Sequence, residues 1–225
     1  MPPKYYCLSL TFLLFTLSIH AQVTSFNFDP NKVNLAWSTK MDSLFQEDQQ
    51  ARLVMMRLKK EGANKQQLDS VQAVIRKKDE ANLRFVTSLI EERGWLGPEE
   101  VGFQGAQALF LVIQHADLKT QKKYYPLIVE AEKEGKILSS NVAILEDRIA
   151  VREGRLQTYG SQGFYDEEQK KTLVYPLVDA EKIDELRKAR GLSTMEAYFP
   201  NWNLQDYSKQ LPYLQERLKA DKISR

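Results

Sequence analysis

The sequence predicts a mainly α protein, a helical bundle of five to seven helices with a small β-hairpin or irregular segment near residues 155–176. Its 225 residues, of which 43% are hydrophobic and 28% charged, are enough to bury one sizeable core. Apolar residues recur at helical spacing over most of the chain, and glycines stand where helices would end. Only the segment near residues 155–176 combines glycines, aromatic residues and a Thr-Leu-Val-Tyr run, a composition typical of short strands.

The first 21 residues are typical of a secretory signal peptide. Lys4 precedes an apolar run from Tyr5 to Ile19, and the small residue Ala21 follows. The run is too short for a comfortable membrane span, which takes about 20 residues. Cys7 lacks the small apolar residues before it that a lipoprotein site needs. We expect cleavage after Ala21, and an uncleaved membrane anchor is the alternative.

Cleavage would leave a single α-rich domain over residues 22–225, in the periplasm or outside a bacterial cell. No segment of this domain is apolar enough to span a membrane. The domain would contain no cysteine and one histidine, His115. Packing without disulfides would therefore hold it together.

The composition argues against several classes of partner and cofactor. Lys+Arg 32 against Asp+Glu 30 gives a net charge of +2 without a basic stripe, so nucleic acid is not expected as a partner. One cysteine and two histidines argue against zinc, iron–sulfur and thiol chemistry. The sequence also lacks a glycine-rich phosphate loop and a G-x-S-x-G elbow. We therefore expect no metal site and no cofactor, and the oligomeric state is left open.

Two long helices are expected to open the domain. No proline or glycine lies between Lys32 and Lys60, and apolar residues recur there at helical spacing. The Glu-Gly-Ala-Asn sequence at residues 61–64 then ends one helix and begins the next, which reaches Gly94. The two helices should pack as an antiparallel hairpin.

The remaining elements follow from the same signals. Residues 102–114 are apolar almost all round, which indicates a helix at the centre of the core. After the hairpin near residues 155–176, the aromatic-rich tail from Asn201 to Arg225 should dock as an irregular strap or a last helix. Further helices are expected over residues 118–134, 140–152, 180–190 and 193–198.

Polar residues interrupt the apolar stripes of the first three helices. These residues are Asp48 with Arg52, Asp79 with Asn82, and His115 followed by Asp117. A buried carboxylate or amide without a partner costs several kcal/mol, about 2–7 by transfer measurements. Such groups therefore persist only if they pair with one another or face a wet cavity.

A second concentration of polar groups begins at Asp147 and Arg148. Glycines and small residues follow, and Gln157, Tyr159 and Gln162 supply amides and a phenol that can approach a ligand. The simplest interpretation of this segment is a solvated helix end that runs into a turn.

Three hypotheses account for these residues. In the first, they form a pocket that binds a polar small molecule or a cell-envelope fragment, with Arg52 and Arg148 holding an anionic group. In the second, the same pocket is a hydrolase or lyase site, with His115 as general base and Asp117 and Asp147 as further catalytic groups. In the third, they are a buried polar network of a structural or interaction protein. The ligand-binding residues of the first hypothesis are Asp48, Arg52, Asp79, Asn82, Arg148, Gln157, Tyr159 and Gln162.

Two motifs carry a resemblance to a known family. The sequence Gln-His-Ala-Asp stands at residues 114–117, and Gln-Thr-Tyr-Gly-Ser-Gln stands at residues 157–162. With the polar pairs of the first two helices, they resemble an uncharacterised bacterial domain-of-unknown-function family marked by QHAD and Q-x-YG-[ST]-Q. The likeness covers about residues 40–165. It implies that these polar positions are the signature of the family, and it implies no activity.

Overall fold

The computed structural model describes residues 22–26 and 28–223, and the expected signal peptide lies outside them. The protein is mainly α, with 68% of the described residues helical, which confirms the predicted fold class. Eight α-helices and one two-stranded antiparallel hairpin are described, after a short 3-10 helix, η1 (Pro30–Lys32). None of the described helices is both long and apolar enough to cross a membrane.

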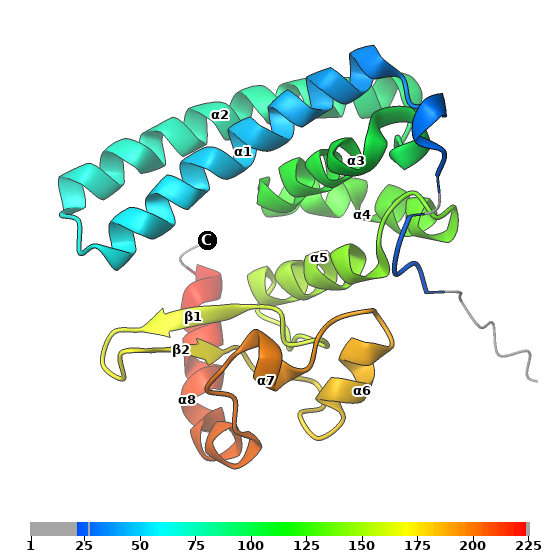
Figure 1. Ribbon diagram of the computed structural model, residues 1–225. Helices are drawn as coiled ribbons and strands as arrows, with labels where there is room; N and C mark the ends of the chain where they lie inside the picture. Colours follow the sequence, from blue (N-terminus) through cyan, green and yellow to red (C-terminus); the bar gives the residue numbers. More distant parts are fainter. Residues whose placement is uncertain (1–21, 27, 224–225) are drawn as a thin grey trace, which may run out of the picture.

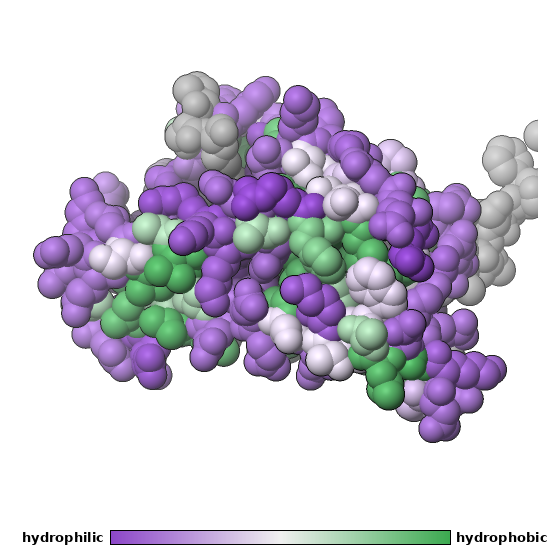
Figure 2. Space-filling model, turned by 90° about the horizontal axis from the view of Figure 1, so that it is seen from above, coloured by the Kyte–Doolittle hydropathy of each residue, from purple (hydrophilic) through white to green (hydrophobic). Residues whose placement is uncertain are grey.

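The first two helices form the long antiparallel hairpin that the sequence predicts. They are α1 (Leu35–Lys60) and α2 (Lys65–Arg93). Asn34 caps α1, and Asn64 begins α2 in a capping box with Gln67. Figure 1 shows that the free end of this hairpin extends well past the other helices. Figure 2 shows hydrophobic side chains among hydrophilic ones at that end, where Leu53 and Met56 are exposed.

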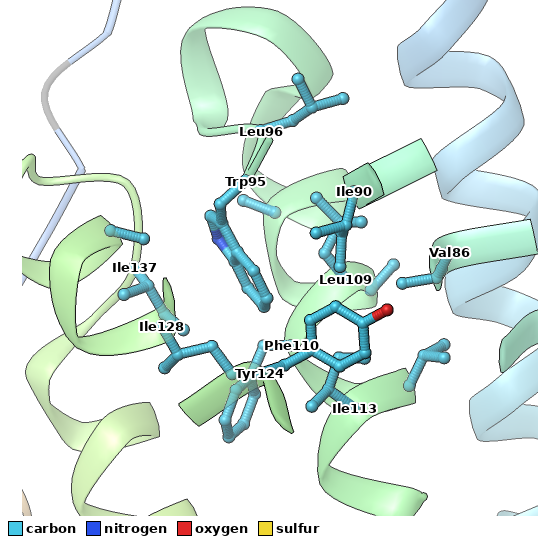
Figure 3. Close-up of a cluster of buried hydrophobic side chains, with 14 of the residues drawn as sticks. Val86, Ile90, Trp95, Leu96, Leu109, Phe110, Ile113, Tyr124, Ile128 and Ile137 are labelled. Carbon is cyan, nitrogen blue, oxygen red and sulfur yellow. The ribbon is translucent and has the colours of Figure 1, made fainter. Parts of the chain in front are cut away.

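Three helices pack beneath the hairpin: α3 (Pro98–His115), α4 (Leu118–Lys133) and α5 (Ser139–Arg152). Helix α3 lies at the centre of the main core, as predicted, with Ala108, Leu109 and Ile113 fully buried. Figure 3 shows Trp95, Tyr124 and other large side chains gathered around it. Its backbone breaks at Gly102, where φ is +73°, so the predicted start at residue 102 coincides with a kink inside a longer helix.

The rest of the chain forms a second layer below α5 (Figure 1). It contains β1 (Gly163–Asp166), β2 (Lys171–Val174), α6 (Ile183–Lys188), α7 (Met195–Tyr198) and α8 (Leu204–Ile223). The strands pair antiparallel with Gly163 opposite Val174, which confirms the hairpin. The aromatic-rich tail forms a regular helix, α8, because Tyr207, Leu214 and Leu218 fall on one face and pack into a second hydrophobic cluster.

Candidate functional site

Four charged or titratable side chains meet where α1, α2 and the end of α3 come together. Asp48 is 3% exposed, and its Oδ1 lies 3.0 Å from Nδ1 of His115 and 3.3 Å from Nη2 of Arg52. The same Nη2 of Arg52 donates to Oδ1 of Asp79 over 2.6 Å. Arg52 thus bridges two carboxylates, one on each helix of the hairpin. We refer to Asp48, Arg52, Asp79 and His115 as the charged cluster.

The neighbours of Asp48 keep its carboxyl group ionised. Burial alone would raise the pKa of Asp48, but the hydrogen bond and charge of His115 and the guanidinium of Arg52 outweigh burial. The pKa of Asp48 therefore lies below its ordinary value. Gln49 adds a further donor, 2.6 Å from Oδ2. The cluster is therefore a paired and hydrogen-bonded set of charges rather than an isolated buried carboxylate.

This arrangement fixes the orientation of the His115 ring. An ionised carboxylate only accepts hydrogen bonds, so Nδ1 of His115 must carry the proton that Asp48 receives. The other nitrogen, Nε2, has no hydrogen-bond partner among the described residues. In its neutral form the ring therefore presents an unprotonated nitrogen that can accept a proton or a hydrogen bond.

A cavity of about 240 Å³ opens beside the charged cluster. We call it the His115 cavity. Arg76 and Glu80 also line it, although they do not interrupt the apolar pattern of the sequence. Their i, i+4 spacing places them on one face of α2 together with Asp79. Four carboxylates against one arginine make the cavity acidic. Its lining residues are Asp48, Arg76, Asp79, Glu80, Leu83, Val112, His115, Ala116 and Asp117.

A larger groove, of about 1050 Å³, begins at Asp117 and runs past the end of α5. We call it the basic groove, because four cationic side chains and two carboxylates line it. Asp117 belongs to both cavities, so the two meet there. Its own carboxylate caps α4 by accepting the N–H of Thr120 over 2.7 Å, which lowers the pKa of Asp117. The groove is lined by Asp117, Leu118, Arg148, Arg152, Glu153, Arg155, Gln162, Gly163 and Lys222.

Asp147 and most of the second motif lie elsewhere. Asp147 is fully buried and accepts hydrogen bonds from the backbone N–H groups of Thr158, Tyr159 and Ser161 over 2.8–3.2 Å. Gln157 is also fully buried, and its amide bonds the backbone N–H and C=O of Gln162. These side chains hold the loop in shape and line neither the His115 cavity nor the basic groove.

The structure therefore distributes the predicted site residues over separate places rather than gathering them in one pocket. Asp48, Arg52, Asp79 and His115 form the charged cluster, Arg148 and Gln162 line the basic groove, and Asp117 joins the two cavities. Asp147, Gln157 and Tyr159 belong to the internal network of the loop. Asn82 is buried on α2 and lines neither cavity.

Arg52 is already paired within the charged cluster. It was expected to hold an anionic group of a ligand, but its Nη2 already contacts Asp48 and Asp79, and it lines neither cavity. Its single positive charge partly offsets the two neighbouring carboxylates, which lets both lie against the same wall of the His115 cavity.

The fold and the site define the class of protein. It is an α-helical protein in which an acidic cavity and a basic groove meet at one aspartate. Residues 42–208 match DUF6624, a family of unknown function, and the chain belongs to this family. The match confirms the resemblance drawn from the two motifs and extends it into α8. No curated protein and no solved structure matches the chain.

Proposed function

We propose that this protein binds a zwitterionic cell-envelope fragment, such as a short peptide with an ammonium group and carboxylates, across Asp117. The observation that carries the proposal is the contact at Asp117 between two cavities of opposite charge. In the acidic His115 cavity, Asp79, Glu80 and Asp117 are suited to an ammonium group. In the basic groove, the cationic side chains are suited to carboxylates.

The proposed location agrees with this choice of ligand. A signal peptide over residues 1–21 would carry the chain to the periplasm or outside the cell. Peptide fragments of the cell envelope are zwitterions and are present in that compartment. We therefore choose the synthetic tripeptide L-alanyl-D-glutamyl-diaminopimelate as the probe.

Glu80→Gln tests the acidic half of the site. Glu80 is exposed and makes no side-chain hydrogen bond to the described residues, so the change removes charge without breaking the charged cluster. We expect tripeptide affinity, measured by titration calorimetry, to fall about two- to fivefold, because an exposed ion pair is worth roughly 0.2–1 kcal/mol. Lys222→Gln should cause a similar loss from the basic half.

The matched controls are Glu181→Gln and Lys182→Gln, whose side chains are exposed and line neither cavity. They should bind the tripeptide like the unmodified protein. A loss in only one of the two test variants would contradict a ligand that spans both cavities. An absence of binding at millimolar tripeptide would contradict the proposal as a whole.

A second candidate function follows from the contact between Asp48 and His115. His115 lines the cavity, and the Asp48 carboxylate on its Nδ1 leaves Nε2 to act as a base, an arrangement suited to activating water or removing a proton from a bound ligand. The second candidate is therefore a hydrolase or lyase that acts on the bound fragment.

His115→Gln separates binding from catalysis. Glutamine keeps a hydrogen-bonding side chain but cannot act as a base near neutral pH. If the protein is an enzyme, products of the tripeptide detected by mass spectrometry should fall at least 100-fold in rate while affinity changes only slightly, since general base catalysis contributes about 10²–10⁴-fold. Equal product formation by both proteins would exclude His115 as the base. Binding without product would favour the binding function alone.

A further inference from the structure

A separate cleft lies in the second layer of the fold and contains none of the predicted site residues. It has a volume of about 520 Å³, within the range of about 300–1,000 Å³ that is usual for small-molecule sites. Strand β2, the segment after α7 and the first turns of α8 form its walls. We call it the aromatic cleft, because Tyr198, Phe199, Trp202 and Tyr207 line it.

The aromatic rings of this cleft are held in fixed positions. Trp202 and Tyr207 pack with their ring centroids 5.1 Å apart, and Tyr198 packs edge-on against Phe199 at 4.9 Å. The hydroxyl of Tyr207 accepts the backbone N–H of Leu177 over 2.6 Å, which ties the ring to the loop after β2. Trp202 and Phe199 are only partly buried. Part of an ordered aromatic surface is therefore open before any ligand binds.

Short polar side chains surround these rings. Asn201, Asn203, Asp206 and Gln210 line the same cleft. Gln210 donates from Nε2 to the backbone carbonyl of Asp206 over 3.1 Å, and its Oε1 is buried without a hydrogen-bond partner among the described residues. A buried acceptor without a donor is unfavourable, and a hydroxyl group of a ligand would satisfy it.

This combination is suited to one chemical class of ligand. The face of an aromatic ring carries partial negative charge and attracts the C–H groups on the flat side of a sugar ring. Side-chain amides both donate hydrogen bonds to hydroxyl groups and accept them, and a carboxylate accepts them. Lys171 is the one cation among the described lining residues, which does not suit a phosphorylated ligand. A purely apolar ligand would leave Oε1 of Gln210 without a donor.

From these contacts we infer that the aromatic cleft binds a neutral saccharide. A sugar ring stacks on Trp202, and its hydroxyl groups bond to Gln210 and Asp206. The cleft is formed by other residues than the His115 cavity and the basic groove, so this inference stands apart from the proposed function.

The test is titration calorimetry of the full chain with three neutral trisaccharides: tri-N-acetylchitotriose, cellotriose and maltotriose. We expect at least one of them to bind saturably at one site. Trp202→Ala should weaken that binding at least tenfold, and Trp202→Phe should retain most of it, since a ring face remains. Gln210→Leu should weaken it severalfold, because the acceptor is lost. Asp206→Asn tests the contact of the saccharide with the carboxylate. Asp206 lies at the exposed start of α8, so the folding of this variant should not change.

Two controls make the result specific. Phe103→Ala removes an exposed aromatic side chain from α3, outside the cleft, and should leave saccharide binding unchanged. His115→Gln should also leave it unchanged, which separates this site from the proposed function. The inference would be overturned if no trisaccharide bound at millimolar concentration, or if binding survived intact in a folded Trp202→Ala variant. Binding of a proline-rich peptide in the cleft without any saccharide binding would overturn it too, because the cleft would then belong to a protein partner.

Discussion

Replacing Asp147 with alanine is expected to lower the free energy of unfolding by about 3–5 kcal/mol. The carboxylate is fully buried and accepts the N–H groups of Thr158, Tyr159 and Ser161. Removal would leave these donors without a partner inside the protein, and an unsatisfied buried donor costs roughly 1–3 kcal/mol. Urea denaturation followed by circular dichroism would measure the loss.

Two further variants define the cause of this effect. Asp147→Asn keeps one acceptor but turns an NH₂ group toward backbone donors, so we expect a smaller loss of about 2 kcal/mol. Glu146→Gln is the matched control, since Glu146 is half-buried and makes no hydrogen bond to the described residues. Burial raises the pKa of Glu146, so removing its charge should leave the stability unchanged or slightly higher. A loss below 1 kcal/mol in Asp147→Ala would show that water replaces the carboxylate.

The second large effect is expected at Arg187, which is also fully buried. Its Nε donates to the carbonyl of Ser193 over 2.5 Å, and its Nη1 donates to the carbonyl of Tyr159 over 2.6 Å. Its guanidinium also lies over the ring of Tyr198, 4.7 Å from the centroid. Arg187→Ala removes all three contacts and leaves a void, so we expect a loss of about 3–4 kcal/mol.

Other variants at Arg187 distinguish the contribution of side-chain volume to stability from the contribution of the hydrogen bonds. Arg187→Met refills most of the void and should recover part of the loss, whereas Arg187→Lys cannot reach both carbonyls and should remain clearly destabilised. Arg84→Ala, at an exposed position of α2, should change stability by no more than about 0.5 kcal/mol. Thermal and urea denaturation would compare these proteins. Equal stability of Arg187→Lys and the unmodified protein would contradict the role of the two hydrogen bonds.

Asp147 and Arg187 should also act together, because both bind the backbone of Tyr159. Asp147 accepts the N–H group of that residue, and Arg187 binds its carbonyl. Two residues that share one peptide segment are expected to show an interaction energy of about 1–2 kcal/mol in a double-mutant cycle. Their shared segment leads directly into Gln162 and Gly163, which line the basic groove. They are therefore positioning residues for that wall of the groove.

The motif residues illustrate why sequence spacing overestimated the size of the site. Gln157 and Gln162 both carry amides that can bind ligands, and spacing alone does not distinguish them. In the structure Gln157 turns inward and bonds the backbone of Gln162 and Tyr175, while Gln162 lines the basic groove. The direction of each side chain depends on the loop conformation, which Asp147 imposes from a helix ten or more residues away.

The sequence by itself determined the helical class, the α1–α2 hairpin, the central position of α3 and the contact between Asp48 and Arg52. These features depend on helical periodicity, caps and i, i+4 spacing, all of which act within a few residues. Only the tertiary structure decided that Arg52 meets Asp79, 27 positions away, and that Asp48 meets His115, 67 positions away. It also decided that the polar residues divide between two cavities and a buried loop network, and that α8 closes an aromatic cleft against β2. Periodicity fixes which face of a helix is polar, whereas the crossing and rotation of packed helices decide which polar faces meet.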